Sequence, residues 1–169
     1  MKQLSLFSLF VVTFFLSVPV QAKPYHSNSG EIIISDLGSW TLDEEEYTEG
    51  YVVVSFKNAQ NDNVRITLQD LPEDMLNNYE RTISAVEQGF RYAGSEIVTT
   101  QPSSFMDGAG YVTYSVNSAY YEETGMLYYH TALWGIINQK LYVVAYATSE
   151  PDTDTHVEWM NLVENIQFK

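Results

Sequence analysis

Two apolar, aromatic-rich runs near the C-terminus are separated by only three residues. Residues 127–137 and 141–148 flank Asn138-Gln139-Lys140, and both runs have the length of strands. So short a connection joins antiparallel neighbours, because parallel strands need a crossover of a dozen or more residues. The chain is therefore predicted to contain an antiparallel sheet, with a meander of strands over residues 95–150.

Shorter strands are predicted before this meander. Residues 64–68 alternate apolar and polar side chains, which places Arg65 and Thr67 together on one face of a strand. Residues 31–35 and 51–56 are rich in β-branched side chains, which favour strands. Asp43–Glu46 lies between these two strands and is predicted to be a charged loop.

Two amphipathic helices complete the pattern. Apolar residues recur every three or four positions from Leu76 to Phe90, after Pro72, which suits the first turn of a helix. A closing helix would place Val157 and Met160 on its inner face. The fold class is therefore α+β: an antiparallel β-sheet with a long central helix and a C-terminal helix, an α/β sandwich.

The first 22 residues are predicted to be a secretory signal peptide. Lys2 precedes an apolar stretch, and Val20-Gln21-Ala22 is a small-x-small cleavage site. We expect residues 23–30 to be a flexible linker and residues 31–169 to form a single domain. The expected location is the bacterial periplasm or the exterior, with no stable membrane insertion after cleavage.

The net charge and the absence of cysteine limit which partners and which chemistry the chain can have. The chain has a formal net charge of −14 and no cysteine, so neither disulfides nor thiolate chemistry is available. Such an acidic surface repels nucleic acid and anionic lipid, and it favours cationic partners. A cysteine-free exported domain is more typical of bacteria than of small animal secreted domains.

The order of several segments resembles the PsbP-like fold family, which includes Mog-type and DcrB-like proteins. The resemblance covers residues 35–168 and rests on pattern rather than on one motif. The segments are Gly-Ser-Trp (38–40), NVRITLQDLP (63–72), MDGAGYVTYSV (106–116), LYYHTALWGIINQKLYVVAYAT (127–148) and ENIQF (164–168). The resemblance implies a single PsbP-like α/β sandwich over residues 31–169. It implies little about function, because one fold hosts unrelated roles.

Acidic and aromatic residues are the candidates for binding a partner. Asp43–Glu46 with Glu49 is the densest acidic run, and paired tyrosines would place rings on both faces of a strand. Tyrosine and tryptophan surfaces are favoured at interfaces. The candidate partner-binding residues are Asp43, Glu44, Glu45, Glu46, Glu49, Tyr120, Tyr121, Tyr128 and Trp134.

Catalytic and metal sites have weaker support in the sequence. No Gly-x-Ser-x-Gly elbow is present, and no catalytic residue is assigned. Asp152, Asp154, His156 and Glu158 could ligate a cation, but acids at a helix start are more simply explained by the helix dipole. No metal site and no cofactor are therefore expected.

We expect an exported, acidic, non-enzymatic binding protein whose partner is a basic protein. An inhibitor or immunity protein against a basic toxin would be one form of it. Two alternatives stay open: a periplasmic hydrolase that uses carboxylates with His130, and a calcium-responsive module. The hydrolase would require His130, a carboxylate and a hydroxyl in one pocket.

Overall fold

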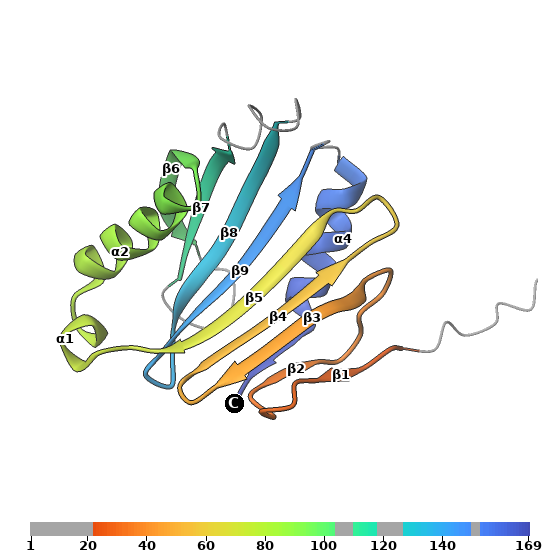
Figure 1. Ribbon diagram of the computed structural model, residues 1–169, viewed down its shortest axis with the longest axis horizontal. Helices are drawn as coiled ribbons and strands as arrows, with labels where there is room; N and C mark the ends of the chain where they lie inside the picture. Colours follow the sequence, from red (N-terminus) through yellow and green to blue (C-terminus); the bar gives the residue numbers. More distant parts are fainter. Residues whose placement is uncertain (1–21, 104–109, 118–126, 150–152) are drawn as a thin grey trace, which may run out of the picture.

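A computed structural model describes residues 22–103, 110–117, 127–149 and 153–169. Seven strands form one antiparallel sheet in the order β3-β4-β5-β9-β8-β7-β6 (Figure 1). This arrangement confirms the predicted meander and the α+β class. The strands are β3 (Thr41–Thr48), β4 (Tyr51–Lys57), β5 (Asn63–Asp70), β6 (Ser95–Ser103), β7 (Gly110–Asn117), β8 (Tyr128–Ile137) and β9 (Lys140–Thr148).

The hairpin between β8 and β9 has the geometry that its short connection requires. Asn138 and Gln139 have φ angles of 49° and 66°, so both lie in the left-handed region. Two such residues form a type I′ turn, whose twist matches that of the flanking strands. The predicted hairpin is confirmed, although Lys140 already pairs with Ile137 and belongs to β9.

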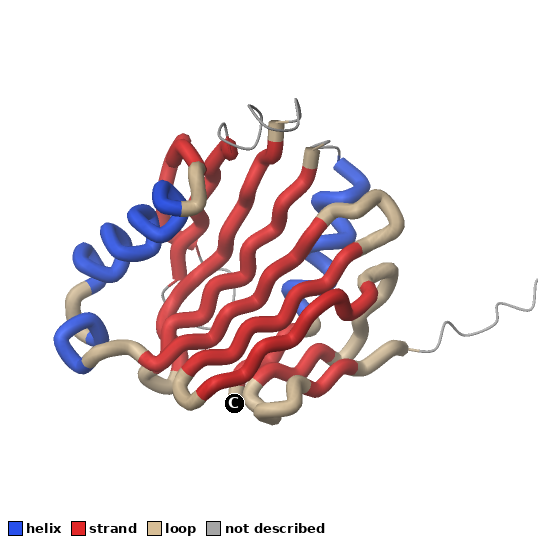
Figure 2. The backbone as a smooth tube through the Cα atoms, viewed as in Figure 1, coloured by secondary structure: helices blue, strands red, loops and turns tan. Residues whose placement is uncertain are grey.

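A second, three-stranded sheet joins the two ends of the described chain. Its order is β1 (Tyr25–His26), β2 (Ile32–Ile34) and β10 (Ile166–Phe168). Together with helix α4 (Thr153–Glu164), it covers one face of the large sheet (Figure 2). The core of the protein lies in this layer, and its fully buried side chains include Trp40, Phe56, Ile66, Trp159 and Leu162.

Residues 23–30 differ from the flexible linker that we expected. Tyr25 pairs with Ile34 of β2, and Ser27 is buried. The Ser27 Oγ accepts a hydrogen bond from the Ile32 backbone N–H at 3.0 Å, which closes the turn between β1 and β2. The segment is polar because its side chains cap this turn. It is therefore part of the fold.

Two helices lie on the other face of the large sheet, where one long helix was predicted. Helix α1 (Glu73–Leu76) ends at Asn77, and α2 (Tyr79–Tyr92) begins after Asn78. The Asn78 side chain accepts a hydrogen bond from the Arg81 backbone N–H at 3.1 Å, so it caps α2 and divides the helix. No helix in the described part of the chain is both long and apolar enough to cross a bilayer.

The acidic run 43–46 is a strand and not the predicted loop. It lies within β3 at the edge of the large sheet, and β4 is its only strand partner among the described residues. A bulge between Leu42 and Glu44 changes the register there. An edge strand has one row of backbone groups facing away from the sheet, so charged side chains are tolerated. Alternation of apolar and polar residues did not predict this strand, because its side chains are acidic on both faces.

Candidate binding surface

Strands β5 and β9 supply the floor of a groove on the α2 side of the sheet. Val64, Ile66 and Leu68 point into the core, so the alternate side chains of β5 point toward α2. Strand β9 alternates in the same way, and the register pairs Arg65 with Ala145. The floor therefore has a polar column beside an apolar one: Arg65, Thr67 and Gln69 on β5, and Leu141, Val143 and Ala145 on β9.

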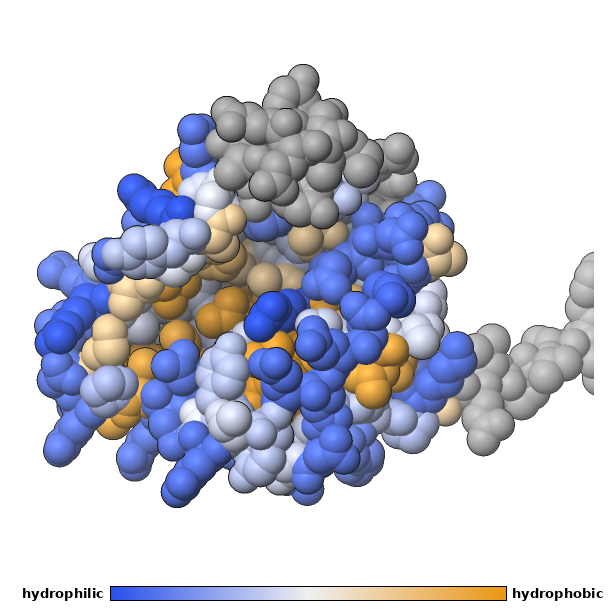
Figure 3. All heavy atoms as spheres, viewed as in Figure 1, coloured by the Kyte–Doolittle hydropathy of each residue, from blue (hydrophilic) through white to orange (hydrophobic). Residues whose placement is uncertain are grey.

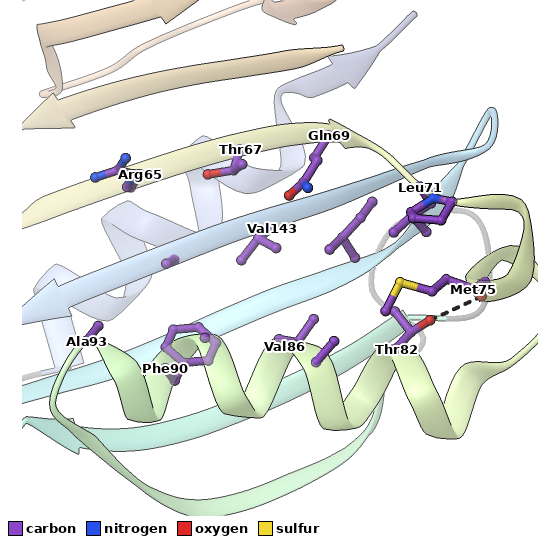
Figure 4. A pocket seen from close by; sticks show the side chains of 15 residues that line it. Arg65, Thr67, Gln69, Leu71, Met75, Thr82, Val86, Phe90, Ala93 and Val143 are labelled. Carbon is purple, nitrogen blue, oxygen red and sulfur yellow. Dashed lines mark hydrogen bonds between the residues drawn. The ribbon is translucent and has the colours of Figure 1, made fainter.

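Helix α2 forms the opposite wall of the groove. Thr82, Val86 and Phe90 recur at helical spacing and face the sheet. Small residues lie between them on the same side of the helix: Ala85, Gly89 and Ala93. Because these small side chains do not fill the space above β5 and β9, a groove of about 590 Å³ remains (Figure 4). Ligand pockets fall within this size range.

The two ends of the groove differ in chemistry. Leu71 and Met75 lie at one end, where the Met75 backbone carbonyl accepts a hydrogen bond from the Thr82 hydroxyl at 3.2 Å (Figure 4). Arg65 lies toward the other end, across the groove from Ala93 of α2 (Figure 4). Arg65 is the only charged residue among the described residues that line the groove. The space-filling view shows apolar side chains gathered in this hollow, with hydrophilic ones around it (Figure 3).

An acidic edge lies on the same sheet face as the groove. Directly opposite residues of antiparallel strands share a face. Ser55 is opposite both Arg65 and Glu44, and Val53 is opposite both Thr67 and Glu46. The side chains of Glu44 and Glu46 are therefore on the groove side of the sheet, two strands away from its polar column. We call the outer edge of β3, with its exposed acids, the acidic edge.

The predicted acidic residues have separate roles in the structure. Glu44, Glu46 and Glu49 are exposed. Asp43 forms an ion pair with Lys57. The Glu45 carboxylate accepts hydrogen bonds from the Tyr25 hydroxyl at 2.8 Å and from the Asn28 backbone N–H at 2.5 Å, so it anchors the N-terminal segment. Burial and the adjacent Glu45 carboxylate raise the pKa of Tyr25, which keeps its hydroxyl protonated as the donor.

Tyr128 and Trp134, the two predicted aromatic residues within the described ranges, do not form an exposed patch. Trp134 is 1% exposed, stacks on Tyr111 at a centroid distance of 4.6 Å and donates to the Thr113 hydroxyl at 3.0 Å. Its assignment as a partner-binding residue is therefore wrong in this structure. Tyr128 is half-buried, and Tyr120 and Tyr121 lie outside the described residues. Tyr47 on β3 is 57% exposed, and sequence reasoning missed it because the strand itself was missed.

The possible metal ligands near α4 also have other contacts. The Glu158 carboxylate accepts from the Ser39 hydroxyl at 2.8 Å, and the His156 ring lies against Trp159 at a centroid distance of 5.4 Å. Asp154 is exposed in the first turn of α4, and Asp152 lies outside the described residues. Among the residues with described positions, no three His, Asp or Glu side chains are grouped as metal ligands.

His130 lies on β8 in contact with one hydroxyl. Its Nδ1 is 3.4 Å from the Ser95 Oγ. The residues opposite it on β7 and β9 are Ser115 and Ala147, neither of which ionises. Within the described ranges, no carboxylate is hydrogen-bonded to the ring. A hydrolase of the expected kind needs a histidine, a hydroxyl and a carboxylate. The histidine and a hydroxyl are in contact here, and a carboxylate is not among the described contacts of the ring.

Burial lowers the pKa of His130, and this predicts a pH dependence of stability. The unfolded chain then binds a proton at a higher pH than the folded chain, so stability falls as the pH drops below about 6.5. We expect His130→Gln to reduce the loss of unfolding free energy between pH 7 and pH 5. Urea unfolding at both pH values measures it. An unchanged loss in the variant would contradict a desolvated ring.

No family model matches this chain, and no curated protein matches it either. The fold does match solved structures. The Saccharomyces cerevisiae Ran-binding protein Mog1p superposes with a TM-score of 0.57 at 11% identity, over 88% of this chain and 95% of that chain. The chain has a PsbP/Mog1-like fold.

Two other structures support the PsbP/Mog1-like fold. Cyanobacterial PsbP from Synechocystis sp. PCC 6803 has a TM-score of 0.52 at 12% identity, over 90% of this chain and 96% of that chain. A Bacteroides thetaiotaomicron protein has a TM-score of 0.51 at 13% identity, over 88% of this chain but 49% of its own length. The family resemblance of the sequence pattern is thereby confirmed at the level of fold, which leaves function to the site.

Proposed function

We propose that this chain is an exported, non-enzymatic binding protein that engages a basic protein partner through the acidic edge. One observation carries the proposal: β3 is an edge strand with a free backbone row and exposed acidic side chains. Backbone hydrogen bonds join β3 to β4 alone among the residues that the structure describes. An extended partner segment could add there as a further strand.

The side chains of β3 suit a basic segment with some apolar character. Glu44 and Glu46 are exposed on the groove side, and Tyr47 and Leu42 are 57% and 43% exposed. Alternate lysines or arginines in an added strand would lie beside these carboxylates. Opposite charges on neighbouring strands are favourable, and complementary charge mainly accelerates association.

The same acids discriminate between partners. Two copies of β3 meeting edge to edge would bring like charges together, which is unfavourable. A basic segment meets no such repulsion. The acidic edge therefore disfavours self-association while it remains open to a cationic strand. An inhibitor or immunity protein of a basic toxin is one form that this function could take.

The test uses a synthetic eight-residue peptide of alternating lysine and threonine, with a glutamate–threonine peptide for comparison. Hydrogen exchange should show added protection of the backbone amides of residues 41–48 with the basic peptide alone. Glu44→Gln combined with Glu46→Gln should slow association about three- to tenfold at low salt, and the difference should shrink at high salt.

The matched control is Glu73→Gln combined with Glu80→Gln, which removes two exposed acids from α1 and α2. It changes the net charge equally, so it should leave the protection of β3 in place. Glu45 is left intact, because its carboxylate holds Tyr25 and Asn28. Equal effects of the two double variants would reduce the proposal to nonspecific charge attraction, and protection outside β3 would also contradict it.

Export with cleavage after Ala22 has support from the start of the described chain. The Lys23 backbone N–H donates to the Asp36 carboxylate at 3.0 Å, and the Gly38 backbone N–H donates to it at the same distance. These hydrogen bonds lower the pKa of Asp36. Cleavage before Lys23 would turn its amide into an ammonium group, and a charge-assisted hydrogen bond is the stronger kind.

The intact mass of the exported product tests this processing. We expect a chain that begins at Lys23. A product that keeps residues 1–22, or that begins several residues beyond Lys23, would contradict the proposed cleavage.

A further inference from the structure

The groove between α2 and the sheet has features that the proposed protein contact at β3 does not use. Its walls are apolar along most of their length, and its cation is Arg65 near one end. The polar column spans Arg65 to Gln69, and the helical wall spans Thr82 to Ala93. At about 3.4 Å per strand residue and 1.5 Å per helical residue, the column is about 14 Å long and the helical wall about 16.5 Å. Such a space fits an elongated ligand.

The guanidinium of Arg65 is available to an anion. It forms no ion pair with any residue of the described ranges. Its neighbours across the strands are Ser55 and Ala145, which carry no charge. Among the described lysines and arginines, Arg65 alone belongs to the lining of the groove. A carboxylate fits its forked donors in a bidentate geometry.

The opposite end of the groove suits an aliphatic tail. Leu71, Met75 and Val86 contribute apolar surface there, and methionine adapts its shape to flexible chains. Leu141 and Val143 continue the apolar column of the floor toward this end. The lining therefore changes from apolar at Leu71 to cationic at Arg65, which matches a ligand with a tail and an anionic head.

We propose that the groove binds a long-chain aliphatic carboxylate, with its carboxylate on Arg65 and its tail directed toward Leu71 and Met75. This site is separate from the acidic edge and goes beyond the proposed function. Tail burial supplies affinity in proportion to the apolar surface removed from water. Arg65 supplies the preference for an anionic head, against the overall negative charge of the protein.

Calorimetric titration of the mature protein with three probes below their micelle concentrations tests the proposal. Dodecanoate should bind with a stoichiometry of one per chain. Dodecyltrimethylammonium has the same tail with a cationic head and should bind at least tenfold more weakly, and butanoate should show no binding. Arg65→Gln should weaken dodecanoate about tenfold or more, since hydrogen bonds to charged groups are strong, and should remove its advantage over the cationic probe.

A second variant tests whether the aliphatic tail of the ligand occupies the groove. A side chain at Gly89 would enter open space, since a Cβ there meets no atom within 4 Å. Gly89→Leu should therefore fold and fill the groove, and it should weaken both long-chain probes at least tenfold. Arg91→Gln is the matched charge control, because Arg91 is exposed on α2, outside the lining, and pairs with Glu87. It should change dodecanoate affinity less than twofold.

Several results would overturn the proposal. These are no binding of dodecanoate, equal binding of the anionic and cationic probes, and an Arg65→Gln or Gly89→Leu effect no larger than that of Arg91→Gln. Circular dichroism of each variant verifies that it is folded. None of these measurements involves β3, so failure of the groove proposal is distinguishable from failure of the basic-partner proposal.

Discussion

Replacing Leu162 of α4 with Ala is expected to lower the free energy of unfolding by about 3 kcal/mol. The Leu162 side chain is 2% exposed and belongs to the core between α4, the small sheet and the large sheet. Truncation of a buried leucine loses transfer free energy and leaves a cavity, which together cost about 2–5 kcal/mol. Urea unfolding of the protein and of the variant measures the change.

The matched control for this prediction is Leu76→Ala on the opposite face of the sheet. Leu76 ends helix α1 and is only half-buried, beside a surface hollow that is separate from the groove, and not in the core. Its truncation should cost less than about 1.5 kcal/mol, because part of the side chain is already in water. Equal losses for the two leucines would mean that both faces of the sheet are packed alike.

The second large effect is expected at Gly135, where Ala should cost about 2 kcal/mol. Gly135 lies in β8 directly opposite Tyr142. A Cβ on Gly135 would lie 2.7 Å from the Tyr142 hydroxyl oxygen and 2.9 Å from Cζ. The Tyr142 ring is buried and stacks on Phe168 at a centroid distance of 5.1 Å, so it has little room to move. Overpacking of this kind costs about 1–3 kcal/mol.

Gly89→Ala is the same chemical change as Gly135→Ala, but we expect it to raise the free energy of unfolding and not to lower it. Gly89 lies within helix α2, and a Cβ there meets no atom within 4 Å. Alanine should stabilise the helix by about 0.5–1 kcal/mol. Thermal or urea unfolding of both variants gives the comparison. A stabilising Gly135→Ala would show that the Tyr142 ring repacks freely.

The sheet was predictable from sequence where polar and apolar residues alternate or turns are short. Residues 64–68 revealed β5, and the short connection at Asn138-Gln139 revealed the β8–β9 hairpin. β3 could not be predicted, because an edge strand with acidic side chains on both faces has no apolar period. The break before α2 was not predicted, because the helical spacing of apolar residues continues across Asn77-Asn78. The backbone is not helical at these two residues.

The candidate sites were less predictable than the fold. Arg65 was placed on the polar face of its strand, but sequence alone did not show that α2 covers this face without filling it. Trp134 was a candidate partner-binding residue, and its burial depends on long-range packing against Tyr111 of β7. Such features follow from how distant segments pack, which local periodicity does not encode.

The pairing of β2 with β10 has a consequence for the timing of folding. Ile34 is opposite Ile166, and the Lys169 backbone N–H donates to the Glu31 carbonyl at 2.9 Å. Strand β2 therefore cannot gain this neighbour until residues 166–168 have been synthesised. Contacts between segments so distant in sequence slow folding, because a long loop must close first. The small sheet, which covers part of the core, is therefore completed only after the strands of the large sheet have all been made.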